Sequence, residues 1–189
     1  SEGIEKPYIA SRGGNVKTKT EGKWMHPKLY IDFAMWLSVE FKSKVIDMVL
    51  DVKPEQVTLV PDGEDAITSN AGWDCEKNLG FLKNVIAEFK NAGIRTSIFL
   101  DPNPEMVKFA KETGADRIEL YTEAYATHYL KNKEEAIKPY IETALEAQKY
   151  GLGINAGHDL SLENLKYFAD HIPNLLEVSI GHALISEAL

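Results

Sequence analysis

A histidine followed by an acid, His158 and Asp159, ends a short apolar run in the stretch GLGINAGHDLSLENL (151–165). A histidine at the carboxyl end of a strand can donate or accept a proton near neutral pH, which makes His158 a candidate for acid–base catalysis. The same residue can equally serve as a turn or capping group before the helix predicted at 161–172. These residues alone leave both interpretations open.

A single carboxylate, Glu119, lies inside the strand-like segment RIELYT (117–122). Successive residues of a strand point to opposite faces, so Glu119 points away from Ile118 and Leu120. In the interior of a barrel this carboxylate would have to be paired or share a proton, which is typical of a functional group. The alternative is a glutamate on an edge strand or a solvent-facing surface.

Polar residues after two other strand-like segments are candidates for substrate binding. Thr68 lies in the loop EDAITSNAGWD (64–74), where its hydroxyl could bond a substrate hydroxyl or phosphate, although such loops commonly bind only water. Gly181 and His182 follow LLEVSI (175–180). A small residue before a helix start favours binding of an anion such as phosphate, although most Gly-His pairs are only turns.

Other kinds of site find little support in the sequence. There is no GxGxxG motif, no Walker A loop and no His/Cys cluster with metal-ligand spacing. The single cysteine, Cys75, has acids nearby that disfavour a thiolate, so we interpret it as structural. We therefore expect no metal site.

The elements that must position these residues alternate regularly from about residue 51 onward. Short apolar strands alternate with segments of helical periodicity, which predicts parallel βαβ units. An open doubly wound sheet and a (β/α)8 barrel both fit this order, and in either one ligands bind at the carboxyl ends of the strands. The predicted strands are 56–60, 94–100, 117–122, 152–155 and 175–180, and the predicted helices are 77–93, 103–114, 133–151 and 161–172.

Composition narrows the class of protein. The 189 residues are 44% hydrophobic and carry a net charge of -8, which favours a folded domain and speaks against a general nucleic-acid binder. No apolar run approaches the roughly 20 residues needed to cross a bilayer. One cysteine is typical of a reducing compartment. We expect a cytoplasmic protein without a membrane partner.

Five blocks of the sequence resemble the pyridoxine 5′-phosphate synthase family of vitamin B6 biosynthesis. They are VTLVPD…AITSNAGWD, AGIRTSIFLDPNPEMV, GADRIELYTEAYA, LGINAGHDLSLENL and EVSIGHALISEAL, and they occur in the family's order between about residue 46 and residue 189. The resemblance implies a TIM barrel. It also implies a transferase that condenses 1-deoxy-D-xylulose 5-phosphate with 3-amino-2-oxopropyl phosphate and releases inorganic phosphate, with no metal or organic cofactor.

The same resemblance implies roles for individual residues. His158 corresponds to a proton donor and Glu119 to a stabiliser of the transition state. Thr68 corresponds to a substrate contact. Asp159 stands where the family often has glycine, so it carries over only a backbone contact to substrate. Gly181 and His182 correspond to residues that bind the substrate phosphate.

The first 50 residues do not follow the alternating pattern. Residues 26–52 have the periodicity of one or two amphipathic helices, and residues 12–45 resemble the C-terminal half of a KilA-N domain, a DNA-binding module of phages. We therefore expect a chimera of two parts: a KilA-N-like fragment at 1–45, and at 46–189 a partial (β/α)8 barrel of about five βα units. The alternative function is a DNA-binding, phage-related protein with an inactive barrel fragment.

The predicted partial barrel lacks the strands that would precede residue 56, together with the histidine and glutamate that act as proton acceptors in the family. An incomplete barrel leaves raw sheet edges and apolar strand faces. We therefore expect the chain to form a homo-oligomer, to cover these edges with its N-terminal helices, or to be poorly soluble.

Overall fold

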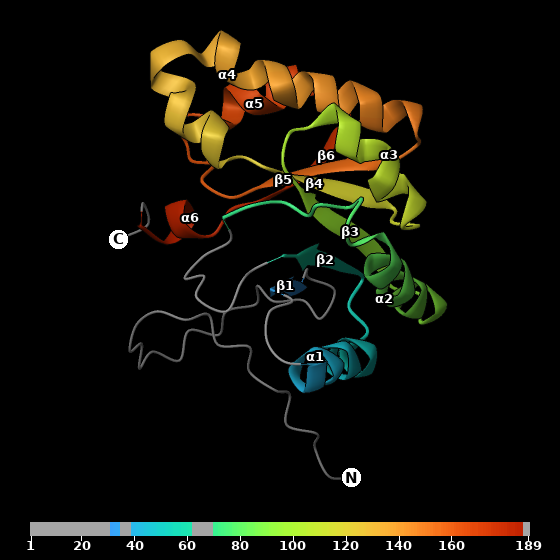
Figure 1. Ribbon diagram of the computed structural model, residues 1–189. Coiled ribbons are helices and arrows are strands. Elements are labelled where there is room, and N and C mark those ends of the chain that lie inside the picture. The colour runs from blue at the N-terminus through green and yellow to red at the C-terminus, as the bar shows by residue number, and fades with distance from the viewer. Residues whose placement is uncertain (1–30, 35–38, 62–69, 187–189) are drawn as a thin grey trace, which may run out of the picture.

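The computed structural model describes residues 31–34, 39–61 and 70–186, with side chains described for residues 44–61, 70–181, 183, 185 and 186. Within these residues the chain forms one sheet of six parallel strands, and each strand pairs with the next strand along the sequence (Figure 1). The strands are β1 (Ile31–Ala34), β2 (Gln56–Val60), β3 (Arg95–Leu100), β4 (Arg117–Tyr121), β5 (Gly153–Gly157) and β6 (Leu175–Ser179).

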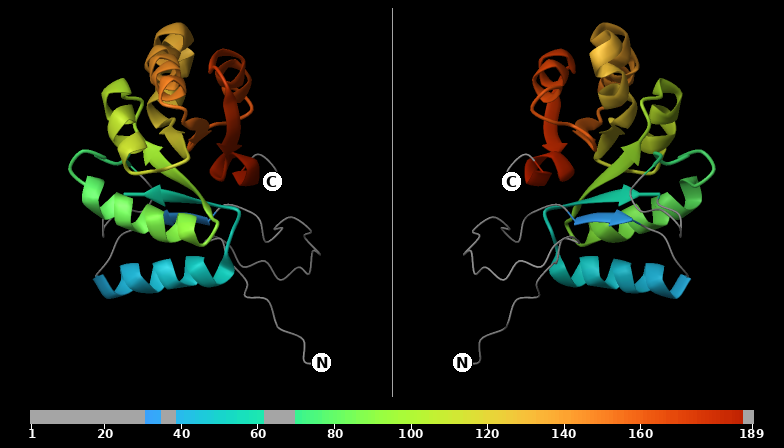
Figure 2. Two further views of the ribbon diagram at one scale, coloured as in Figure 1. Left: turned by 90° about the vertical axis from the view of Figure 1, so that its right-hand side faces the viewer. Right: turned by 90° about the vertical axis from the view of Figure 1, so that its left-hand side faces the viewer.

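The strand order decides between the two architectures that the sequence left open. Connections between parallel strands are almost always right-handed, so helices lie on both faces only where the strand order reverses. Here the order does not reverse, and helices α1 to α5 follow the outside of an arc of strands (Figure 2). This is the arrangement of a partial (β/α)8 barrel. The helices are α1 (Val39–Val52), α2 (Leu79–Asn91), α3 (Pro104–Glu112), α4 (Glu123–Lys149), α5 (Leu165–His171) and α6 (His182–Ser186).

The core lies between the outer face of the sheet and the helices. Apolar residues at alternate positions of strands β2 to β5 join buried residues of the helices in one cluster. Burying one such side chain stabilises the fold by about 1.5–3 kcal/mol. The strand members are Val57, Leu59, Ile98, Leu100, Ile118, Leu120, Ile154 and Ala156, and the helix members include Leu82, Phe89, Val107, Tyr140, Ala144 and Phe168.

All five predicted strands are present, but the helical prediction for residues 26–52 is partly wrong. Helix α1 confirms the second half of this prediction. Ile31–Ala34 is instead a strand, with Ile31 opposite Val57 and Phe33 opposite Leu59. A parallel strand gains backbone hydrogen bonds from the open edge of β2, and such pairing overrides a weak helical periodicity.

Helix α4 begins at Glu123, before the predicted helix 133–151, and it contains a break. The non-helical residue is Asn132, with φ −159° and ψ 89°. Its side-chain oxygen accepts a hydrogen bond from the backbone N–H of Glu135 at 3.1 Å, so Asn132 caps the second part of α4. Asn103 caps α3, because its side-chain oxygen accepts from the backbone N–H of Glu105 at 2.9 Å.

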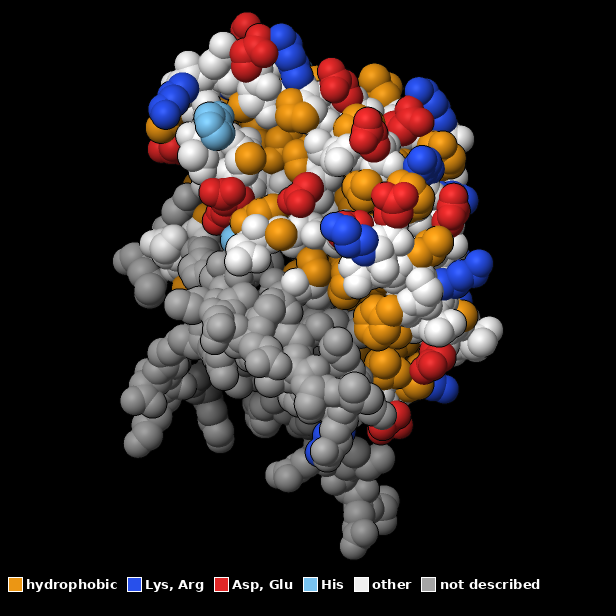
Figure 3. Space-filling model, viewed as in Figure 1, with side chains coloured by type: hydrophobic (Ala, Val, Ile, Leu, Met, Phe, Trp, Pro, Cys, Tyr) orange, Lys and Arg blue, Asp and Glu red, His pale blue; other side chains and the backbone are white. Residues whose placement is uncertain are grey.

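The outer surface of the helices carries charges of both signs. Acidic and basic side chains are interspersed over α3 and α4 on the face shown in Figure 3, which is typical of a solvated surface. No helix among the described residues is long and apolar enough to cross a membrane.

Candidate active site

Most residues on the inner face of the sheet are polar, because successive residues of the strands alternate in type, and Val60, Phe99 and Tyr121 form a small apolar cluster among them. In β4, Ile118 and Leu120 belong to the outer core, and the residues between and beside them point the other way. Glu119 lies opposite Phe99 of β3 and Asn155 of β5. The inner face therefore brings together polar side chains from several strands, at the edge where ligands bind in barrels of this kind.

Glu119 is buried on this inner face, with 2% of its surface exposed. Its Oε2 atom accepts a hydrogen bond from the Thr58 hydroxyl at 2.9 Å, across two strands. A Cβ atom at Gly157 would lie 2.4 Å from Glu119 Oε1, so glycine at this position leaves room for the carboxylate. The prediction that Glu119 points into a barrel interior is confirmed, and the edge or solvent-facing alternative is wrong.

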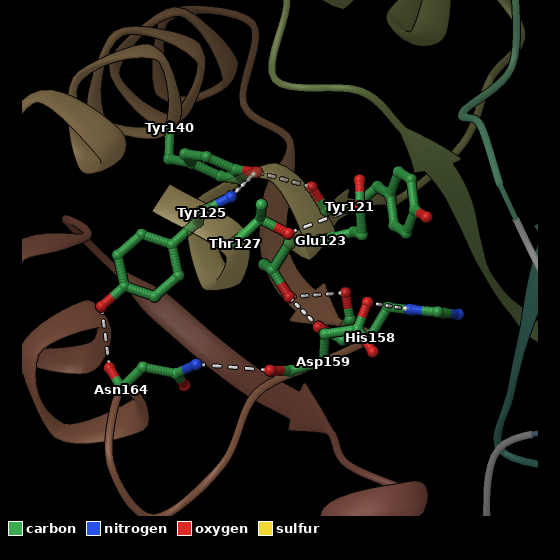
Figure 4. A network of polar contacts seen from close by, with 10 residues as sticks. Tyr121, Glu123, Tyr125, Thr127, Tyr140, His158, Asp159 and Asn164 are labelled. Atoms are coloured by element: carbon green, nitrogen blue, oxygen red, sulfur yellow. Dashed lines mark hydrogen bonds and ion pairs between the residues drawn. The ribbon is translucent and has the colours of Figure 1, made fainter. Parts of the chain in front are cut away.

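His158 lies directly after β5 and next in the chain to Gly157, the glycine that leaves room for Glu119. Its imidazole packs edge-on against the Tyr121 ring, with ring centroids 5.1 Å apart. Its Nδ1 atom lies 2.8 Å from Asp159 Oδ2, and Figure 4 shows the other ring nitrogen at the far end of the side chain. The N-cap of the following helix α5 is Asn164, so His158 does not cap that helix.

The backbone at His158 and Asp159 is unusual. Both residues have positive φ values, 80° for His158 and 55° for Asp159, which non-glycine residues seldom adopt. The positive φ at Asp159 gives a physical reason why glycine, which adopts such values without strain, suits this position. It also turns the chain sharply away from β5, so that the histidine side chain is presented at the carboxyl end of the sheet.

Two buried tyrosines connect the loops that follow β4 and β5 (Figure 4). The Tyr140 hydroxyl donates to the carbonyl of Tyr121 at 2.9 Å and accepts from the backbone N–H of Tyr125 at 3.1 Å. The Tyr125 hydroxyl donates to the carbonyl of Asn164 at 2.8 Å. Burial raises the pKa of both tyrosines above the ordinary value, so both hydroxyls keep their protons and remain donors.

A second polar layer lies nearer the amino ends of the strands. Arg117 Nη1 donates to Asn155 Oδ1 at 3.1 Å and contacts the carboxylate of Glu177, and Arg95 Nε donates to Gln56 Oε1 at 2.7 Å. Burial, followed by the nearby charge of Arg95, lowers the pKa of Arg117. Our sequence reasoning missed this layer, although charged residues at inward positions of apolar strands are a usable signal for it.

The other predicted site residues are placed less completely. Gly181 is exposed between β6 and α6, and space for a Cβ atom there is open. His182 is the first residue of α6, but its side chain is outside the described set. Thr68 lies outside the described residues.

The loop that leads from Thr68 back to the helices is fixed at its later residues. Trp73 donates through its indole N–H to the carbonyl of Leu59 at 3.0 Å and through its backbone N–H to the carbonyl of Phe99 at 2.9 Å. A Cβ atom at Gly72 would lie 2.1 Å from the backbone nitrogen of Asp101, so only glycine fits this close approach. The loop is thereby tied to the carboxyl ends of β2 and β3.

Cys75 agrees with its structural interpretation. It is fully buried, and burial, with a smaller contribution from Asp74, raises the pKa of its thiol to about 12. The thiol therefore stays protonated near neutral pH and is a poor nucleophile.

Among the described residues, no group of three or more His, Cys, Asp or Glu side chains could hold a metal ion.

Residues 26–189 match the family model described as Pyridoxal phosphate biosynthesis protein PdxJ. The chain belongs to the PdxJ family. The match includes residues 26–45, so it gives no support to a separate KilA-N-like origin for them, or to the DNA-binding alternative. The family resemblance inferred from the five sequence blocks is confirmed.

Curated relatives of this PdxJ family chain carry the name pyridoxine 5′-phosphate synthase. The protein of Christiangramia forsetii is 64% identical over 205 aligned positions, which cover 100% of this chain and 86% of the relative. Those of Bacteroides thetaiotaomicron and Flavobacterium johnsoniae are 62% and 63% identical over 144 positions, covering 76% of this chain. The aligned part spans 61% of the length of each of the latter two.

Solved structures support the fold and nothing more specific. A Thermobaculum terrenum O-GlcNAc hydrolase aligns with a TM-score of 0.52 at 11% identity, covering 78% of this chain and 39% of the hydrolase. The pneumococcal virulence factor StrH aligns with a TM-score of 0.51 at 11% identity, covering 80% of this chain and 57% of the other. At such identities the likeness shows a shared α/β architecture.

Proposed function

We propose that this PdxJ family chain is a pyridoxine 5′-phosphate synthase. In that reaction 1-deoxy-D-xylulose 5-phosphate condenses with 3-amino-2-oxopropyl phosphate to give pyridoxine 5′-phosphate, inorganic phosphate and water. The observation that carries the proposal is that a buried carboxylate, Glu119, lies on the inner face of the sheet and that His158 directly follows the neighbouring strand β5. The Glu119 carboxylate reaches to Gly157, the residue immediately before His158.

Glu119 is suited to stabilise positive charge that develops on the substrate. Joining the substrate amine to a carbonyl passes through cationic nitrogen species, and a carboxylate that is already buried and oriented stabilises them strongly. Thr58 holds one carboxylate oxygen, and the confined space above Gly157 holds the other. The carboxylate therefore needs little reorganisation when charge appears nearby.

His158 is suited to donate a proton to a leaving group. Its Nδ1 atom is engaged by Asp159, so the other ring nitrogen, Nε2, is the atom that exchanges a proton with substrate. Each loss of water or phosphate requires protonation of a departing oxygen, and a positioned histidine accelerates such a step by roughly 10²–10⁴-fold.

The remaining family roles belong to the same proposal. Thr68 contacts substrate through its hydroxyl, and Asp159 contacts substrate through its backbone. Gly181 and His182 bind the substrate phosphate at the start of α6, where an exposed glycine lets an anion approach the backbone closely. The chemistry is acid–base throughout and needs no organic cofactor.

The test is to incubate the purified chain with both phosphorylated substrates and to measure pyridoxine 5′-phosphate by chromatography. We expect turnover by the wild type and a loss of about 10²–10⁴-fold in kcat for His158→Asn and for Glu119→Gln. The control variants are His128→Asn and Glu112→Gln, whose residues are exposed on α4 and α3. Absence of product from the wild type at high enzyme concentration would overturn the proposal.

We also propose that the chain self-associates. Strand β6 is at one edge of the sheet, and its outward side chains Leu176 and Val178 are 54% and 36% exposed. An open edge strand with apolar side chains is a ready surface for association. Light scattering is expected to show a stable oligomer, and a monodisperse monomer at high concentration would contradict this.

A further inference from the structure

Two residues beside the site occupy helix N-cap positions but make no capping hydrogen bond with their side chains. Thr122 is the N-cap of α4 and Asn164 is the N-cap of α5, yet neither side chain makes a capping hydrogen bond. A side-chain cap from such residues typically stabilises a helix by about 1 kcal/mol. Both residue types are suited to this task, so their polar groups are engaged elsewhere instead.

Both side chains are directed at the turn after β5. The Thr122 hydroxyl shares its single hydrogen between the carbonyl of Gly157, at 2.9 Å, and the carbonyl of His158. The backbone N–H of Thr122 also donates to the Gly157 carbonyl, at 3.0 Å. Asn164 Nδ2 donates to the next carbonyl, that of Asp159, at 3.3 Å. Three successive carbonyls are thus held by the N-caps of two helices.

These three carbonyls belong to the segment with the unusual backbone. Each non-glycine residue with positive φ costs on the order of 1–3 kcal/mol and persists only where its surroundings enforce it. His158 and Asp159 are two such residues in succession. Thr122 is fully buried, so its hydrogen bonds are shielded from competing water.

We infer that Thr122 and Asn164 are positioning residues, which hold the left-handed turn at His158 and Asp159 and so fix the imidazole against the Tyr121 ring. The inference rests on the proposed role of His158 for its catalytic consequence, but not for its structural one. Both N-cap side chains direct their donors at this strained turn, which presents the proposed proton donor. The Tyr125 hydroxyl joins the two N-cap segments by donating to the carbonyl of Asn164, and Tyr140 holds the backbone N–H of Tyr125.

The variant Thr122→Val tests this, because valine keeps the shape of threonine and removes the hydroxyl. The matched control is Thr143→Val in α4, since Thr143 is also fully buried and its hydroxyl also donates to a backbone carbonyl, that of Pro139, at 2.7 Å. Thr122→Ser restores the donor. Asn164→Asp is an independent second variant that keeps the oxygen accepting from the backbone N–H of Ser161, at 2.9 Å, but removes the donor to Asp159.

The first readout is the NMR signal of the His158 ring, assigned by its disappearance in His158→Asn. The edge-on Tyr121 ring shifts this signal, and Tyr121→Leu defines the unshifted position. We expect the shift to shrink by at least half in Thr122→Val and in Asn164→Asp, and to persist in Thr143→Val and Thr122→Ser. A shift that persists in both Thr122→Val and Asn164→Asp would overturn the inference.

The second readout is catalysis. A displacement of about 1 Å in a catalytic group can cost roughly 100-fold in rate, so we expect kcat to fall 10- to 100-fold in Thr122→Val with KM changed less than threefold. Thr122→Ser and Thr143→Val should stay within threefold of wild type. Loss of the NMR shift in a chain with no turnover would support the positioning role and reject the proposed function. If Thr122→Val fails to fold, Asn164→Asp and Thr122→Ser decide the outcome.

Discussion

The two faces of the same strands differ in what they contribute. On the outer face of β4, Ile118 and Leu120 are fully buried against the helices and belong to the main core. On the inner face, Glu119 is almost as deeply buried but is held by hydrogen bonding, and Tyr121 packs on His158. One residue step along a strand therefore separates a side chain that stabilises the fold from one that can do chemistry.

Burial of a side chain therefore has opposite effects on stability on the two faces of this sheet. An outer side chain is stabilising in proportion to the apolar surface that it removes from water. An inner polar side chain costs free energy unless it finds a partner, so the inner face is specified by matched groups and by glycines that make room for them. Changes on the outer face should act through lost volume, and changes on the inner face through crowding or lost partners.

The largest effect on stability is expected on the outer face. Leu120→Ala should lower the free energy of unfolding by about 3 kcal/mol, within the 2–5 kcal/mol typical of a buried leucine, because it leaves a cavity in the core. The control is Leu130→Ala in α4, whose leucine is 83% exposed and whose change should stay within about 0.5 kcal/mol. Chemical denaturation measures both, and equal effects would erase the distinction between core and surface.

A smaller effect is expected from crowding the inner face. Gly157→Ala places a methyl group where Glu119 Oε1 lies, so we expect a loss of about 1–3 kcal/mol in unfolding free energy together with loss of turnover. The control Gly80→Ala in α2 meets nothing within 4 Å and should stabilise the chain by up to about 0.5–1 kcal/mol, because alanine favours a helix over glycine. A neutral Gly157→Ala would show that the inner face is looser than the contacts indicate.

The smallest effect concerns a carboxylate outside the inner face, three residues before Glu119. Asp116 accepts hydrogen bonds from the backbone and hydroxyl of Thr96 at 2.9 and 3.0 Å, and pairs with Lys90 at 2.7 Å. Burial by itself raises the pKa of Asp116, but the hydrogen bonds from Lys90 and Thr96 outweigh it and lower that pKa below the ordinary value of 3.8. Asp116 therefore ties the start of β4 to β3 and α2.

Because the pKa of Asp116 is lower in the folded chain, its stabilisation is present above the unfolded pKa and is lost as the pH falls through the folded pKa. The side chain is 33% exposed, so solvent screening limits the effect of Asp116→Asn at pH 7 to about 1 kcal/mol. Denaturation at several pH values should show the gap to wild type closing below about pH 4. A gap that widened in acid would contradict the assignment.

The strands of the outer core were predictable from the sequence because their signal is local. Runs such as 117–122 and 175–180 are apolar, bounded by turn residues and separated by helical periodicity, and each became a strand. The positions of Glu119 and His158 at strand interior and strand end followed from the same pattern. Residues 31–34 were mispredicted because their conformation depends on β2, more than 20 residues further along the chain.

The sequence by itself determined the alternation of strands and helices, the family, and which residue types stand at the strand ends. Only the tertiary structure decided that the strand order never reverses, that Thr58 reaches Glu119 across 61 residues of chain, and that Thr122 holds the turn at His158 across 36. The physical reason is range. Periodicity and turn chemistry act between near neighbours in the sequence. The partners of buried polar groups depend instead on which distant segments the folded chain brings within hydrogen-bond distance.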